Sequence, residues 1–263
     1  MNAIARARAQ LRLRLDLADS LKSWRLARSY RLDGAFRRVY LYHVRKTGGT
    51  SLTYMFLGLG GEDSRQVYAR LTHSRNYRVI SGGKVFVGWR KELIEQGRYY
   101  YAFSHIPAHE LRLPPETFTV TCLRDPVERV ISLYKMLLEY RAIGKPHPAM
   151  KKQGRWLGDS FGDFLERIPR EHLLRQLFMF SKTFSPDEAF GRIRACSHYF
   201  FLEDFADGAQ SLSARLGLAF QPVHVHQSQG EPDIEPHEAE ELRARLEPER
   251  VLCDRLRGAQ GAA

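Results

Sequence analysis

The feature that most constrains this fold is a series of short strand-like runs, each followed by a segment with helical character. The runs are rich in β-branched and aromatic residues and have the lengths of ordinary strands; they are Arg37 to Val44, Tyr99 to Ser104, Thr117 to Leu123 and His198 to Glu203. Strands that alternate with helices predict a parallel sheet covered by helices on both faces. We therefore expect an α/β fold with a P-loop-like parallel sheet.

The intervening segments predict most of the helices. We expect helices at Ser51–Leu59, Val127–Tyr140, 160–180, 186–195, Phe205–Leu216 and Pro236–Leu256. Asp125 and Pro126 suit the N-cap and the first position of the second of these helices. Residues 60–98 are mixed in character, and residues 142–159 read as a Gly/Pro/Lys loop.

Two regions are expected along the chain. Residues 1–35 form a basic N-terminal arm of one or two helices, and residues 36–263 form a single domain. The arm either lies on the domain with a solvated basic face or contacts a membrane surface or a partner. It has no continuous apolar segment, and no later segment is long enough to span a bilayer. We expect a cytoplasmic protein with no transmembrane segment, for which peripheral membrane contact stays open.

The charge and the cysteines narrow the function classes. Forty-one Lys and Arg against 30 Asp and Glu leave a formal net charge of +11, which favours anionic partners without choosing among them. Three isolated cysteines, Cys122, Cys196 and Cys253, indicate neither a disulfide framework nor a zinc site. Cys122 lies in an apolar strand-like run and is expected to be a buried thiol.

The segment YLYHVRKTGGTSL, from Tyr40 to Leu52, is the strongest local signal. A strand there leads through a glycine turn into a helix, whose first N–H groups and dipole attract anions. Gly48 and Gly49 allow close approach of the backbone, Thr50 and Ser51 add hydroxyl donors, and Lys46 adds a cation. The segment is not the nucleoside-triphosphate P-loop, because Lys46 precedes the glycines.

A second segment, TVTCLRDPVERVISLY, places Arg124 at the carboxyl end of a strand and Ser132 in the following helix. Ligands bind at the carboxyl ends of strands in open parallel sheets, so Arg124 is placed to hold a phosphate group. Arg129 is expected near the same side of the helix as Ser132. Alternatively, Arg124 forms a structural ion pair and Ser132 is merely exposed.

Together these two segments resemble those of the sulfotransferases that use 3′-phosphoadenosine 5′-phosphosulfate (PAPS), in the carbohydrate branch with its bacterial relatives. The resemblance implies a single sulfotransferase-type domain and PAPS as co-substrate, with no metal. It places the 5′-phosphosulfate on Arg45, Lys46, Thr47, Gly48, Gly49, Thr50 and Ser51. It places the 3′-phosphate on Arg124 and Ser132, and makes Lys46 a catalytic cation.

Between the two motifs, FSHIPAHEL places His105 directly after a strand-like run. Histidine can take a proton near neutral pH, and related carbohydrate sulfotransferases carry a proposed base here. His105 is therefore the candidate catalytic base, with His109 as its rival. The C-terminal segment HVHQSQ departs from the family, since His226 stands where an asparagine is expected.

The acceptor is expected to be a hydroxyl group of a saccharide. The 142–159 segment could bind it through Lys145, His147, Lys151, Lys152, Arg155 and Trp156, or could simply carry solvated charges. Two other functions stay open at this point. A kinase-like phosphotransferase would need carboxylates for Mg²⁺, and an inactive anion- or nucleic-acid-binding protein would need interleaved basic and aromatic residues. We see neither pattern, and expect no nucleic-acid partner.

Overall fold

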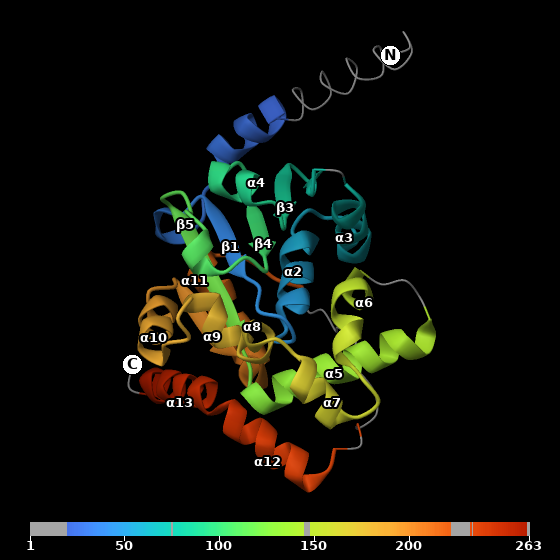
Figure 1. Cartoon of the computed structure of the whole chain (residues 1–263). Coiled ribbons are helices and arrows are strands. Elements are labelled where there is room, and N and C mark those ends of the chain that lie inside the picture. Colours follow the sequence, from blue (N-terminus) through green and yellow to red (C-terminus); the bar gives the residue numbers. More distant parts are fainter. Residues whose placement is uncertain (1–19, 75, 145–147, 222–231, 233, 262–263) are drawn as a thin grey trace.

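The computed structural model describes residues 20–74, 76–144, 148–221, 232 and 234–261 (Figure 1). A six-stranded sheet has the order β2–β3–β4–β1–β5–β6. Its strands are β1 (Arg38–Tyr42), β2 (Arg78–Ser81), β3 (Lys84–Gly88), β4 (Tyr101–Ser104), β5 (Thr117–Leu123) and β6 (His198–Phe201). All neighbouring pairs are parallel except β2 with β3. The expected α/β fold is confirmed, with one antiparallel edge strand added.

Helices flank this sheet on both faces. Those that follow β1 and start before residue 150 are α2 (Gly49–Gly58), α3 (Ser64–His73), α4 (Lys91–Gln96), α5 (Pro126–Ile143) and α6 (Pro148–Gln153). The later ones are α7 (Phe161–Arg167), α8 (Arg170–Leu173), α9 (Arg175–Phe180), α10 (Pro186–Arg194), α11 (Phe205–Leu216), α12 (Pro236–Arg245) and α13 (Glu247–Gly261). Short 3-10 turns are η1 (Asp33–Ala35), η2 (Ala108–Glu110), η3 (Gly154–Trp156) and η4 (Leu202–Asp204).

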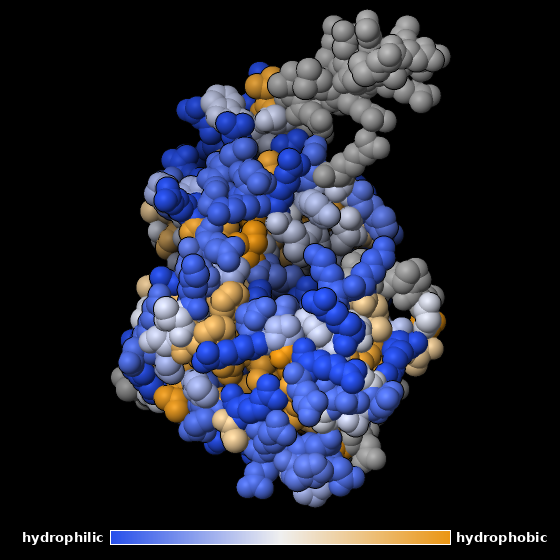
Figure 2. Space-filling model, in the orientation of Figure 1, coloured by the Kyte–Doolittle hydropathy of each residue, from blue (hydrophilic) through white to orange (hydrophobic). Residues whose placement is uncertain are grey.

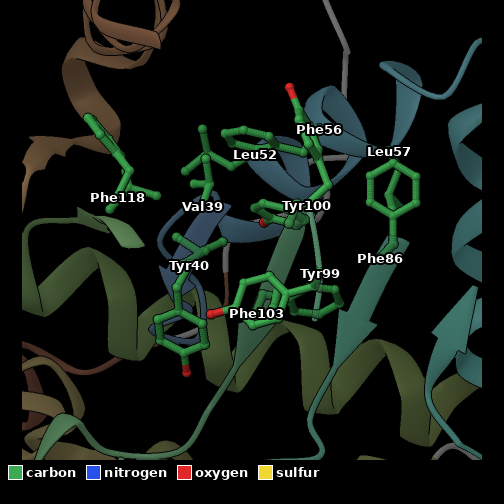
Figure 3. Close-up of a cluster of buried hydrophobic side chains, with 14 of the residues drawn as sticks. Val39, Tyr40, Leu52, Phe56, Leu57, Phe86, Tyr99, Tyr100, Phe103 and Phe118 are labelled. Atoms are coloured by element: carbon green, nitrogen blue, oxygen red, sulfur yellow. The ribbon is translucent and has the colours of Figure 1, made fainter. Parts of the chain in front are cut away.

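The apolar side chains form two clusters. One packs α2, α3 and α11 against the strands, and Figure 3 shows part of it around Val39, Phe56 and Phe103. The other joins α5, α7, α9, α10 and α13. The face of the molecule in Figure 2 is mainly hydrophilic, with smaller hydrophobic areas between the charged ones. The hydrophobic residues that define the strands and helices are thus largely withdrawn from solvent, which is the main term favouring folding.

Helix α5 begins as its sequence predicts. Asp125 is the N-cap and accepts a 2.9 Å hydrogen bond from the backbone N–H of Glu128, while Pro126 occupies the first position. The helix continues to Ile143 and ends at Gly144, whose positive φ of 63° terminates it.

The predicted loop over 142–159 is wrong in its described part, which folds into α6 and η3. Trp156 is only 4% exposed and packs against the ring of His172, with 4.6 Å between centroids. It is therefore unavailable to stack on a saccharide, and its apolar burial explains why the segment is ordered. Lys145 and His147 lie outside the described residues.

Two predicted helices are also interrupted. Pro169 and Leu174 divide the segment 160–180 into α7, α8 and α9, because proline cannot continue a helix and Leu174 leaves helical geometry. The final helix divides at Leu246, between α12 and α13. Within 60–98 the chain forms α3, α4 and the β2–β3 hairpin, none of which the sequence predicted.

Of the N-terminal arm, residues 20–29 are helical. Ala27 and Ser23 face the domain, whereas Leu21 and Trp24 are exposed. The Tyr30 hydroxyl donates to the Gly83 carbonyl at 3.0 Å and accepts from the Val85 N–H at 2.9 Å, which ties the arm to the β2–β3 hairpin. Among the described residues, no helix is both long and apolar enough to span a membrane. Residues 1–19 lie outside the description, as do His226 and its neighbours.

Candidate active site

The sheet order brings the carboxyl ends of three strands together. β1 lies between β4 and β5, and Tyr42 at its end is in register with Ser104 on one side and Thr121 on the other. The segments that follow these strands carry Lys46, His105 and Arg124 respectively. The three sequence elements that we singled out therefore lie at one edge of the sheet, where open α/β sheets bind ligands.

The loop after β1 makes an unusually close turn into α2. Lys46 and Gly48 both have positive φ, of 67° and 81°, and α2 begins at Gly49. A Cβ atom on Gly49 would lie 2.1 Å from Cδ2 of His43, and one on Gly48 would lie 2.7 Å from Cδ1 of Leu202. Glycine is thus favoured at both positions, at Gly49 by the packed His43 ring and at Gly48 by its positive φ, and α2 begins with N–H groups that have no partner within the helix.

The hydroxyls of this loop divide into two kinds. Thr47 is 1% exposed and its Oγ1 donates to the carbonyl of Val44 at 3.0 Å, so its hydroxyl supports the turn itself. Thr50 and Ser51 lie half-buried in the first turn of α2. Any role of Thr47 in anion binding must therefore come from its backbone N–H.

Two cations of the loop, Arg45 and Lys46, are partly withdrawn from water. Burial lowers the pKa of both; for Lys46 the nearby charge of Arg124 lowers the pKa further, and the carboxylate of Glu139 opposes this shift. In the described part of the chain neither side chain forms a direct ion pair. Partly buried positive charges that no direct ion pair neutralises favour the binding of an anion, since an unpaired buried charge is costly.

His105 is tied to the backbone of the same loop. Its Nδ1 lies 2.6 Å from the carbonyl oxygen of His43, and because a carbonyl can only accept, Nδ1 carries the proton. Nε2 is then the unprotonated nitrogen. Burial, then the neighbouring His43 and Arg45, hold the pKa of His105 well below its usual value. The side chain is therefore a neutral base at physiological pH, and the Arg175 guanidinium donates to its carbonyl oxygen.

His109 has different surroundings. It lies in η2, with Nε2 3.8 Å from Oε1 of Glu110 and its ring edge-on to that of Phe178 at 5.4 Å. Burial lowers its pKa below the usual value. Only His105, of the two rival bases, is hydrogen-bonded to the loop that contains Lys46.

Arg124 is held through its backbone. Its N–H donates to Oε1 of Gln176 at 2.8 Å, and its carbonyl accepts from Nε2 of Gln176 at 2.9 Å. The side chain is 22% exposed and reaches Glu128 at 3.3 Å. This ion pair is the structural role that the sequence left open for Arg124. The guanidinium is nevertheless close enough to Lys46 for its positive charge to lower the pKa of Lys46. Ser132 lies half-buried on α5.

Gln176, whose side chain holds the backbone of Arg124, is itself held by Glu249 of α13. Oε1 of Glu249 accepts from the backbone N–H groups of Gln176 and Leu177 at 2.5 and 2.9 Å. Its other oxygen lies 3.4 Å from Nη2 of Arg129, and both side chains are fully buried. Arg129 and Ser132 lie three residues apart on α5, as expected for one side of the helix, but Arg129 is fully buried whereas Ser132 is half-buried. Attraction to Arg129 opposes the burial that raises the pKa of Glu249.

Gln176, Glu249 and Arg175 were missed by sequence reasoning. A single glutamine within the apolar run HLLRQLF is the only local signal for Gln176, and Glu249 resembles its exposed neighbours in a charged helix.

Comparison with known proteins decides the class of chemistry. A model of the sulfotransferase family matches residues 36–235, which is more than half of the chain. The chain belongs to the sulfotransferase family. No curated protein matches it significantly.

The sulfotransferase transfers a sulfuryl group, and members of its family generally take that group from PAPS. The family match thus favours sulfuryl transfer over the phosphotransferase and inactive-binder alternatives. Its range contains the loops with Lys46, His105 and Arg124, whereas α12 and α13 follow it. Among the residues that the structure describes, no cluster of three or more metal-ligating side chains occurs.

Proposed function

We propose that the sulfotransferase moves a sulfuryl group from PAPS to a hydroxyl of a carbohydrate acceptor, with His105 as general base. One observation carries the proposal most directly. The neutral His105, with Nε2 unprotonated, is hydrogen-bonded to the loop that carries the partly buried cations Arg45 and Lys46, neither of which forms a direct ion pair in the described part of the chain.

The residues present fit the two anionic ends of PAPS. The glycine-lined start of α2, with Arg45, Lys46 and the backbone from Thr47 to Ser51, would hold the 5′-phosphosulfate. Arg124 and Ser132 would hold the 3′-phosphate from the neighbouring strand end. When bound, PAPS supplies the sulfuryl group, whose S–O bond to the 5′-phosphate breaks as the acceptor oxygen forms a new bond to sulfur.

The chain's own residues then have separate tasks. Nε2 of His105 takes the proton of the acceptor hydroxyl, and the hydrogen bond from Nδ1 to His43 holds the ring in the required tautomer. Lys46 stabilises the negative charge that develops on the phosphate oxygen. The positive φ of Lys46 is a strained geometry that its surroundings maintain, as occurs at functional sites.

Calorimetric titration with 3′-phosphoadenosine 5′-phosphate (PAP) tests the nucleotide site, with ADP as the comparison. We expect micromolar binding of PAP, weak binding of ADP, and loss of the preference in Arg124→Ala. The exposed Arg215, on α11, provides the matched control Arg215→Ala. Equal affinity for PAP and ADP in the wild-type protein would contradict the proposed 3′-phosphate site.

Turnover assays test the catalytic assignments separately. His105→Ala and Lys46→Ala should each lower kcat by about 100-fold or more, whereas His237→Ala, at an exposed histidine, should not change it. Normal turnover in His105→Ala, together with loss in His109→Ala, would assign the base to His109 instead.

A further inference from the structure

A hollow of about 500 Å³ lies at the end of β3, the strand that pairs with β4, after which His105 follows. Tyr77, Trp89, Arg90, Lys91 and Glu92 line it. Two aromatic side chains with several polar groups are typical of sites that bind small polar ligands. None of the site residues considered above contributes to it.

The unpredicted hairpin places this hollow at the edge where His105 lies. β3 is parallel to β4, so Trp89 after β3 and His105 after β4 lie at the same end of the sheet. β2 runs in the opposite direction, which brings Tyr77, before its start, to that end as well. The Gly88 N–H donates to the Tyr77 carbonyl at 2.9 Å and fixes this placement.

Ring contacts connect the hollow to the base. The centroids of Trp89 and Phe103 are 4.8 Å apart, those of Phe103 and His43 are 6.0 Å apart, and those of His43 and His105 are 4.5 Å apart. Three ring contacts, through the buried rings of Phe103 and His43, therefore link Trp89 to His105.

The two aromatic residues are held in an unfavourable backbone geometry. Tyr77 and Trp89 have φ values of 47° and 54°, in the left-handed region that bulky residues avoid. Their rings meet edge to face at 5.6 Å, and Tyr77 remains 40% exposed although the β2–β3 pairing fixes its backbone. Backbone strain at a bulky aromatic residue is costly, and residues strained in this way cluster at sites that bind ligands.

The polar rim indicates which ligand fits. Arg90 donates to Oδ1 of Asn76 at 3.1 Å and lies 3.6 Å from Glu92, while Lys91 pairs with Glu95 at 3.9 Å. These cations already have partners, so the rim is not built for a polyanion. Amide, carboxylate and guanidinium groups around aromatic faces suit a pyranose ring, whose C–H face packs on aromatics and whose hydroxyls need donors and acceptors.

We propose that the Tyr77–Trp89 hollow binds one saccharide ring of the acceptor and directs a neighbouring hydroxyl toward His105. The proposal rests on the proposed function, because it assigns the acceptor side of that reaction. The aromatic rings supply contact area, and Arg90 and Glu92 supply hydrogen bonds to ring hydroxyls.

Tyr77→Gly is the decisive variant. Glycine adopts the positive φ without strain, which offsets the lost ring contact with Trp89, so the fold should be retained while the ring is removed. On an array of unsulfated hexose, hexosamine and uronic-acid oligosaccharides, we expect the wild-type protein to bind and Tyr77→Gly to lose about tenfold in affinity. Trp24→Ala removes an exposed aromatic on the N-terminal helix and should leave glycan binding unchanged. Trp89→Phe, which keeps a ring, should retain most of the binding.

PAP titration of the same proteins separates the two proposals. We expect Tyr77→Gly to bind PAP as the wild-type protein does. If the wild-type protein binds PAP but no glycan, the saccharide site is overturned and the nucleotide site stands. The same conclusion follows if Tyr77→Gly binds glycan as tightly as the wild-type protein does. Glycan binding that depends on Tyr77, in a protein that fails to bind PAP, would support the hollow and refute the proposed function.

Discussion

The buried carboxylate of Glu249 links the C-terminal helix to the proposed nucleotide site, and removing its charge has a calculable effect. Glu249→Gln keeps an acceptor oxygen for the N–H groups of Gln176 and Leu177 but leaves Arg129 as an unpaired buried charge. Breaking such a pair costs about 3–5 kcal/mol. For a chain of this size, each kcal/mol lowers Tm by about 2–4 °C, so we expect a decrease of roughly 6–20 °C.

Two further variants separate charge from hydrogen bonding. Glu249→Leu also leaves two buried N–H groups without an acceptor, at about 1–3 kcal/mol each, and should be less stable than Glu249→Gln. The double variant Glu249→Gln with Arg129→Met removes both charges, retains the acceptor, and should recover most of the stability. Glu247→Gln is the matched control, since that carboxylate is 60% exposed and its pair with Arg250 contributes only about 0–1 kcal/mol.

Urea and thermal unfolding of these four variants and the wild-type protein, with PAP titration in parallel, test this reasoning. PAP affinity should fall with Glu249→Gln, because the carboxylate positions Gln176, which holds the backbone of Arg124. A loss of less than about 1 kcal/mol for Glu249→Gln, equal to that of Glu247→Gln, would refute the buried-pair argument. An unrecovered double variant would refute the assignment of the cost to Arg129.

Three more predictions concern the same edge of the sheet. Gln176→Leu removes both hydrogen bonds to the backbone of Arg124 and should reduce the preference for PAP over ADP by about tenfold in calorimetry, beyond any change in Tm. Gly49→Ala would place a methyl group 2.1 Å from the His43 ring and should abolish PAP binding, whereas Gly191→Ala, with open space around its Cβ, should be neutral or stabilising by up to about 1 kcal/mol in urea unfolding. Burial lowers the pKa of His43 to about 3, so below pH 6.5 the unfolded chain takes up a proton that the folded chain does not. This contribution to the free energy of unfolding is thus present above pH 6.5 and lost as the pH falls toward 3, by about 2 kcal/mol at pH 5. Urea unfolding at pH 7.5 and 5 measures the loss. If His43→Asn loses as much unfolding free energy between these two pH values as the wild-type protein, the assignment to His43 is contradicted.

The local elements of this protein could be predicted because their causes are local. The β-branched run of β5 and the periodic run of α11 have the bounds that the sequence predicts, and Asp125 with Pro126 starts α5 as expected. The turn from β1 into α2 needs glycine for reasons internal to the turn and its immediate packing. The amino-acid sequence by itself therefore determined the α/β class and pointed to the two segments that we propose bind the anionic ends of PAPS.

Tertiary structure decided what depends on partners distant in the chain. Arg129 is buried because Glu249, 120 residues later, provides the opposite charge, and Trp156 is buried because it packs on His172. The direction of β2, which brings Tyr77 beside Trp89, depends on pairing with β3 rather than on the residues of β2. Hydrophobic pattern and propensity report which residues favour burial or extension, but they do not report which distant group will meet them; that choice is made by packing and electrostatics in the folded chain.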